Sequence, residues 1–157
     1  MNELDITLPS ERELVATRVF AAPPSLVYEC WTSPALLHRW YGPRGWSLVV
    51  CEIDLRVGGA WRFVSRKPDG REVGQHGIYR ELVPGARIVH TESWEDWDPG
   101  ELLVTVEFQP SEHGTRLTST TLFPAREVRD RLLASGMNDG LIETYAKLDD
   151  VLGGKTG

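Results

Sequence analysis

Residues 102–123 read LLVTVEFQPSEHGTRLTSTTLF, and the predicted fold follows from the pattern of this stretch. In its first half, every second residue is large and apolar: Leu102, Val104, Val106 and Phe108. Polar side chains stand between them from Thr105 onward. This alternation predicts a β-strand that buries one face. The SEHG turn (111–114) then reverses the chain into a second strand, so the stretch predicts an antiparallel hairpin.

The second strand of the hairpin carries hydroxyl groups on the face that we expect to be buried. Leu117 and Phe123 share that face with three hydroxyl side chains: Thr115, Ser119 and Thr121. Buried hydroxyls need hydrogen-bond partners. They either bond nearby backbone or supply the few polar groups of an otherwise apolar binding cavity. The residues alone leave both interpretations open.

The same strand pattern extends upstream as far as Trp46. Short runs rich in β-branched and aromatic residues are separated by turn sequences: VGG (57–59), KPDG (67–70), VPGA (83–86), DPGE (98–101) and SEHG (111–114). Proline presets φ and glycine accepts positive φ, so these sequences favour tight turns. Six strands joined by five turns predict an antiparallel meander over 46–123. The segment ELVATRVFAA (13–22) adds a seventh strand.

Two short helices and one long helix complete the predicted elements. The segments PPSLVYECWT (23–32) and SPALLHRWYGP (33–43) carry prolines suited to a first helical turn, and Ser33 is a natural N-cap. After Pro124, apolar residues recur at helical spacing: Val128, Leu132, Leu133, Met137, Leu141, Tyr145, Leu148 and Leu152. This stripe predicts one long helix, kinked at Gly136, that covers the sheet.

The element order predicts an α+β fold in one domain. A curved seven-stranded antiparallel sheet wraps around the long C-terminal helix, and the two short helices follow the first strand. We assign the domain to residues 13–152, with a loosely ordered segment at 1–12 and a tail at 153–157. Curvature would leave a cavity beneath the helix, although six tryptophans and two methionines can equally fill it as a solid core.

Composition narrows the classes of function. The chain has 157 residues, of which 41% are apolar and 25% charged, and its net charge is −6. These values are typical of a globular domain, and the negative charge disfavours nucleic-acid binding. No apolar stretch reaches the length of a membrane span, and the polar start MNELDITLPSERE does not resemble a signal peptide. We therefore expect a cytoplasmic protein without membrane insertion, in which Cys30 and Cys51 are free buried thiols.

The double glycine in DLRVGGAWRF (54–63) raises the question of a phosphate-binding loop. Such loops lead into a helix N-terminus, but this one leads into a strand pattern. A tight turn or bulge is the better interpretation, with Gly59 allowing a close approach of another backbone or a ligand. Trp61, Phe63 and Ser65 then share one face of the following strand.

The sequence shows no recognisable catalytic or metal-binding motif. The four histidines lack a local partner nucleophile, and the acidic stretch ESWEDWDPGE (92–101) does not match the spacing of a calcium-binding loop. We therefore predict no metal and no cofactor. His76 and His90 lie on predicted strands, where either can face inward.

Several of these segments resemble the START-like (SRPBCC) superfamily, in the branch named after the activator of heat-shock-protein-90 ATPase. The resemblance covers about residues 13–152 and is most specific at three places: Trp40, the Asp54-Arg56-Gly58-Gly59 run, and Gly114-Thr115-Arg116. It implies the helix-grip fold, in which a curved sheet grips a long C-terminal helix. Many relatives carry a tryptophan just after the glycine of the last helix, where this chain has Met137.

Together these features predict a cavity between sheet and helix that binds a small apolar or amphipathic molecule. The expected lining is Trp61, Phe63, His76, Trp94, Val104, Val106, Ser119, Met137 and Tyr145, with His90 as the alternative histidine. The resemblance also implies two other roles: a cyclase- or dehydratase-type enzyme that uses the same cavity, or a chaperone-associated stress-response protein. A partly exposed aromatic rim can further support a homodimer.

Overall fold

The computed structural model describes residues 4–95 and 100–154. Its strands, in chain order, are β1 (Asp5–Thr7), β2 (Glu13–Phe20), β3 (Ser47–Ile53), β4 (Ala60–Arg66), β5 (Glu72–Val83), β6 (Arg87–Trp94), β7 (Leu102–Ser111) and β8 (Gly114–Leu122). Its helices are α1 (Pro24–Thr32), α2 (Pro34–Trp40), α3 (Arg126–Ala134) and α4 (Met137–Leu152). The DPGE turn (98–101) predicted before β7 lies partly outside the described residues.

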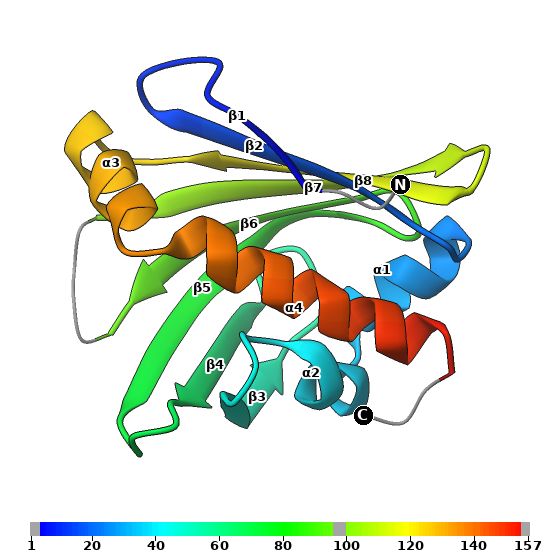
Figure 1. Cartoon of the computed structure of the whole chain (residues 1–157), viewed down its shortest axis with the longest axis horizontal. Helices are drawn as coiled ribbons and strands as arrows, with labels where there is room; N and C mark the ends of the chain where they lie inside the picture. Colours follow the sequence, from blue (N-terminus) through cyan, green and yellow to red (C-terminus); the bar gives the residue numbers. More distant parts are fainter. Residues whose placement is uncertain (1–3, 96–99, 155–157) are drawn as a thin grey trace.

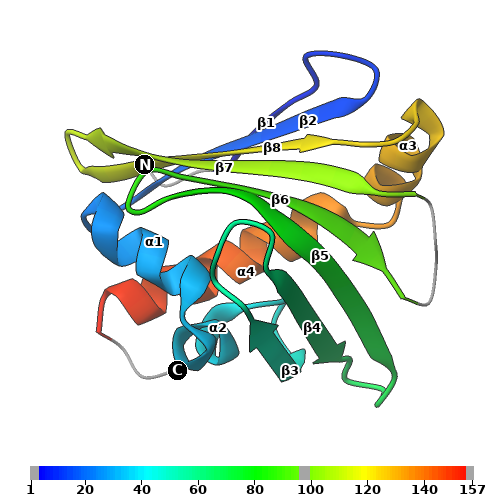
Figure 2. The ribbon, with the colours of Figure 1, turned by 180° about the vertical axis from the view of Figure 1, so that it is seen from behind.

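The strands form one antiparallel sheet in the order β1-β2-β8-β7-β6-β5-β4-β3. The sheet is curved, and α4 runs across its concave side (Figure 1). Seen from behind, α1 and α2 lie at one end of the sheet and α3 lies at the other end (Figure 2). The α+β class and the helix-grip arrangement expected from the sequence are therefore confirmed.

The hydrophobic core is divided into two clusters. The larger one lies where α1, α2 and α4 meet the sheet, and it includes Trp40 and Leu148. The smaller one involves α3 and includes Phe123 and Leu132. Over the ranges 4–95 and 100–154, no helix combines the length and the apolar character needed to cross a membrane.

The position of α4 on the sheet is fixed through β2. Residues of β2 alternate between half-buried and buried positions, and Arg18 lies on the buried side with 8% of its surface exposed. The Arg18 guanidinium donates a hydrogen bond to the Tyr145 carbonyl at 3.1 Å and forms an ion pair with Asp149. The Phe20 and Tyr145 rings also meet edge to face, with centroids 5.4 Å apart. A buried cation with partners on α4 therefore holds the helix in place.

The double glycine forms a turn that lies against β5. Gly58 has a φ of +86°. Its N–H donates to the Tyr79 carbonyl at 2.8 Å, and the Tyr79 N–H donates to the Gly59 carbonyl at 2.9 Å. A Cβ atom on Gly59 would lie 2.1 Å from the Asp54 carbonyl oxygen. Gly58 is thus needed for its positive φ, and Gly59 is needed for the close approach of backbone.

The sheet has eight strands, so the expectation of seven was wrong. Residues 5–7, which we placed in a loosely ordered segment, form the edge strand β1, in which Ile6 pairs with Ala16 of β2. A strand of three residues is too short to show a periodic pattern. Only the pairing in the folded chain reveals it.

The predicted long C-terminal helix is two helices. Helix α3 ends at Ala134 and α4 begins at Met137, and Gly136 between them has a φ of +91°. The Ser135 hydroxyl donates to the Leu132 carbonyl at 2.7 Å at the end of α3. Apolar residues on both sides of the break join the same cluster. The stripe in the sequence therefore continues across the break and could not distinguish it from a kink.

Candidate functional site: a cavity beneath the C-terminal helix

A cavity of about 620 Å³ lies between the concave side of the sheet and α4. Strands β2 and β4–β8 line it on one side, and α1, α2, α3, α4 and the segment 41–46 contribute the rest. The inward side chains follow the two-residue period of the strands, for example Trp61, Phe63 and Ser65 on β4. Strand pleating therefore aims these side chains into the cavity.

Eight of the nine residues expected in the lining are found there: Trp61, Phe63, Trp94, Val104, Val106, Ser119, Met137 and Tyr145. The sequence pattern could place those on the strands because each belongs to a clear alternating run. Met137 is the first residue of α4, directly after the break at Gly136. Its place in the lining therefore depends on where α4 begins.

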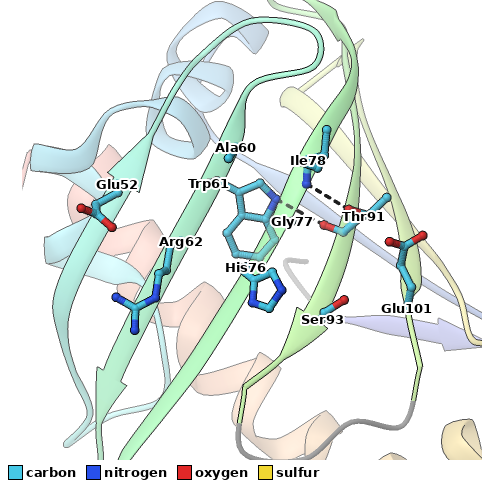
Figure 3. Close-up of a pocket in the computed structure, with 10 residues that line it drawn as sticks. All are labelled: Glu52, Ala60, Trp61, Arg62, His76, Gly77, Ile78, Thr91, Ser93 and Glu101. Carbon is cyan, nitrogen blue, oxygen red and sulfur yellow. Dashed lines mark hydrogen bonds between the residues drawn. The ribbon is translucent and has the colours of Figure 1, made fainter.

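His76 is the exception and lies on the opposite face of the sheet. Strand β5 directs Gln75 and Tyr79 into the cavity, so the pleat directs His76 outward, where Figure 3 shows it beside Arg62. The His76 Nδ1 atom lies 3.3 Å from Glu95 Oε2. Arg62 donates two hydrogen bonds to the same carboxylate, at 2.9 and 3.0 Å. These Arg62 hydrogen bonds are the main cause of the lowered pKa of Glu95.

His90 is the histidine that faces the cavity. Its Nδ1 atom lies 3.0 Å from the Thr91 carbonyl oxygen, which also accepts the Trp61 indole N–H at 3.2 Å. A carbonyl oxygen only accepts, so Nδ1 carries a proton and the neutral ring keeps its lone pair on Nε2. Burial lowers the pKa of His90, against a smaller opposing effect of Glu92. The ring is therefore neutral at pH 7, and Nε2 has no hydrogen-bond partner in the described part of the chain.

Glu92 lies two residues along the same strand and is held by a chain of hydrogen bonds. The Tyr41 hydroxyl donates to Gln75 Oε1 at 3.0 Å, which turns the amide nitrogen of Gln75 toward Glu92. That nitrogen donates to Glu92 Oε2 at 3.2 Å, and the Trp94 indole N–H donates to the same oxygen at 3.0 Å. The carboxylate is thus held in the cavity wall by two direct hydrogen bonds, and Tyr41 supports one of the donors, Gln75.

These polar residues of the site were not among those predicted from the sequence, where Glu92 belonged only to an acidic stretch. A signal was present, because Ile88, His90, Glu92 and Trp94 alternate along one strand. Tyr41 lies in the connection between α2 and β3, where no periodic pattern exists to show which way a side chain points. No feature of the sequence could have placed Tyr41 next to Gln75.

The hydroxyl groups divide between the two interpretations left open by the sequence. The Thr115 hydroxyl donates to the Ala22 carbonyl at 2.6 Å and so satisfies the backbone. Ser119 and Thr121 instead line the cavity. Burial raises the pKa of Tyr41 and of Tyr145 well above the ordinary value, so both lining phenols remain protonated.

The described residues contain no group of three or more His, Cys, Asp or Glu side chains that could hold a metal ion. Cys30 is buried and Cys51 is partly buried, and both are free. Burial raises the pKa of each thiol to about 11. Both cysteines are therefore thiols rather than reactive thiolates at neutral pH.

The curved sheet, the C-terminal helix across it and the cavity between them define a helix-grip domain of the START-like class. Residues 21–153 match the family described as activator of Hsp90 ATPase homolog 1-like protein. The chain belongs to this family, which confirms the resemblance seen in the sequence.

Solved structures agree with this assignment. The crystal structure of a Rhodobacter sphaeroides protein is 36% identical in sequence, covers 97% of this chain and 99% of that chain, and superposes with a TM-score of 0.91. A Nitrosomonas europaea protein is 28% identical over 92% of this chain and 96% of that chain, with a TM-score of 0.83. A Silicibacter pomeroyi protein named for the same family is 24% identical over 90% of this chain and 97% of that chain. It superposes with a TM-score of 0.73 and shares the fold. A comparison with curated proteins gives no match.

Proposed function

We propose that the protein binds a small apolar or amphipathic molecule in the cavity beneath α4. The observation that carries this proposal is the cavity of about 620 Å³, whose lining is mainly aromatic and aliphatic with a few polar groups on β5, β6 and β8. A volume and a lining of this kind are typical of small-molecule sites. Membership of the family supports a ligand-binding or chaperone-associated role in general.

Native mass spectrometry of the protein purified from its source tests this proposal directly. A bound small molecule of defined mass is the expected result, and it would also identify the chemical class of the ligand. A clean mass of the chain alone, together with no tryptophan fluorescence response to a panel of apolar molecules, would contradict the proposal.

A pair of variants on β7 tests the location. Val104 lines the cavity, whereas the neighbouring Leu103 is 37% exposed on the opposite face of the strand. Val104→Trp fills the cavity and should weaken binding of an apolar dye at least about tenfold, which is about 1.4 kcal/mol. Leu103→Trp adds the same ring outside and should leave the affinity unchanged. Equal affinities in two variants that fold by circular dichroism would place the dye elsewhere.

An enzyme of the cyclase or dehydratase type is a second candidate. It is favoured by His90, because the lone pair on Nε2 can accept a proton from a molecule bound in the same cavity. Once the ligand is identified, conversion by the wild type and not by His90→Gln would support this function. Binding without conversion by the wild type would contradict it.

The remaining expectations concern partners and location. The family name associates this family with the Hsp90 ATPase, and a pull-down against that chaperone tests whether this chain shares the association. Analytical ultracentrifugation tests the expected homodimer, and fractionation of cells tests the expected cytoplasmic location. A monomer and a failed pull-down would leave small-molecule binding as the function to pursue.

A further inference from the structure

One end of the cavity wall carries two hydrogen-bond acceptors, Glu92 and His90. Around Glu92, the N–H groups of Gln75 and Trp94 donate to the carboxylate, and the Tyr41 hydroxyl donates to Gln75. The acceptors that stay available at this end are the lone pair on His90 Nε2 and the remaining lone pairs of Glu92. A molecule that hydrogen-bonds to these two groups supplies the hydrogen.

Glu92 also brings a negative charge to this end of the cavity. No ion pair among residues 4–95 and 100–154 includes Glu92. Lys67 lines the cavity too, but its Nζ atom lies over the Trp46 ring, 5.4 Å from the centroid, and makes no ion pair with Glu92. Because charges interact more strongly at the low effective dielectric of a protein interior, a cation is the best complement to this carboxylate. The net charge of −6 also favours the approach of cations.

Aromatic rings stand next to the two acceptors. The Trp61 and His90 ring centroids are 5.2 Å apart, Trp61 and Phe63 are 4.9 Å apart, and Phe63 and Tyr41 are 5.0 Å apart. Aromatic faces attract cations as well as apolar groups. The same wall can therefore hold the apolar body of a ligand and a positive group attached to it.

We propose that the ligand is an amphipathic amine, an apolar body that carries a primary or secondary ammonium group, and that Glu92 and His90 receive its N–H donors. This inference rests on the proposed binding function and names the chemical class of the ligand. Glu92 supplies the charge and His90 Nε2 supplies a second acceptor. The rings of Trp61 and Phe63 contact the apolar body.

Isothermal titration calorimetry at pH 7 with four probes of matched shape tests the proposal. The probes are naphthylmethylamine, naphthylmethanol, ethylnaphthalene and naphthoate, each substituted at the same ring position. The amine should bind at least about tenfold tighter than the alcohol or the hydrocarbon, because a charge-assisted hydrogen bond is stronger than a neutral one. The carboxylate probe should bind most weakly of the four.

Glu92→Gln keeps the shape of the side chain and removes its charge, so it should abolish the preference for the amine. The control is Glu52→Gln, which makes the same change on an exposed residue of β3 and should keep the preference. Equal affinity of the wild type for amine and hydrocarbon would overturn the amine assignment and leave the binding function standing. So would an unchanged preference in a folded Glu92→Gln variant. If none of the four probes binds, the amine assignment and the proposed binding function are both overturned. If Glu92→Gln fails to fold, the affinities of the wild type for the four probes still decide the outcome.

Discussion

Trp61 closes a gap in the sheet beside the cavity, so its replacement should reduce both stability and binding. The pairing of β5 with β6 is interrupted around Gly77. There, the Trp61 indole donates to the Thr91 carbonyl at 3.2 Å, and the Thr91 hydroxyl accepts the Ile78 N–H at 2.9 Å (Figure 3). A Cβ atom on Gly77 would lie 2.6 Å from Trp61 Nε1. The indole N–H thus donates to the Thr91 carbonyl where the pairing between β5 and β6 is interrupted.

Two substitutions of Trp61 distinguish the contribution of its hydrogen bond to stability from the contribution of its ring. Trp61→Phe removes the N–H but keeps an aromatic ring, and the lost hydrogen bond to Thr91 should lower the free energy of unfolding by about 1 kcal/mol. Trp61→Ala also removes a ring that is 4% exposed. A large-to-small change of this kind costs about 3 to 5 kcal/mol in a filled core. We expect the lower end, about 3 kcal/mol, because one side of the ring already borders the cavity.

Urea denaturation measures the two free energies, and titration with an apolar dye measures binding. Trp61→Ala should weaken dye binding about tenfold, while Trp61→Phe should stay within about twofold of the wild type. Ile78→Ala is the control, since Ile78 is 39% exposed on the outer face and should affect neither measurement strongly. A folded Trp61→Ala variant that binds the dye as the wild type does, or that loses less than about 1 kcal/mol of unfolding free energy, would contradict this role of Trp61.

Three further predictions concern stability. Gly136→Ala should lower the free energy of unfolding by about 1 to 2 kcal/mol, because the φ of +91° is unfavourable for a residue with a Cβ atom; thermal unfolding followed by circular dichroism checks this. Arg18→Leu should cost about 2 kcal/mol, less than for a fully buried pair because Asp149 is 33% exposed, and an unchanged urea midpoint would contradict it. For pH, burial lowers the folded-state pKa of His90, so below about pH 6.5 the unfolded chain binds a proton that the folded chain does not. Stability should therefore fall with decreasing pH, by at most about 1.4 kcal/mol per pH unit from this residue, and His90→Gln should show a smaller fall between pH 7 and pH 5 in urea denaturation.

Most strands and helices of the fold could be predicted from the sequence, because the patterns that indicate them are local. Alternation along Leu102–Phe108 and turn sequences such as KPDG (67–70) fix strands and their ends within a few residues. The pairing of neighbouring strands then follows from short connections. This is why the six-stranded meander and most of the cavity lining agree with the structure.

Local patterns in the sequence did not show which of the two histidines, His76 or His90, faces the cavity. The two histidines lie on adjacent strands, and a shift of one residue in strand phase exchanges the inner and outer faces. The phase of β5 is set by its pairing with β4 and β6 and by the interruption around Gly77. A sequence pattern broken by glycine does not carry that information.

Residues close together in the chain specify the α+β class, the order of the main strands and helices, and the apolar character of the inner face. The folded structure was needed to reveal the edge strand β1, the break at Gly136 and the polar group formed by Tyr41, Gln75 and Glu92. The edge strand and the polar group depend on contacts between residues distant in sequence, and such contacts form only once the sheet has curved around the helix. The break at Gly136 is local, but the apolar stripe continues across it.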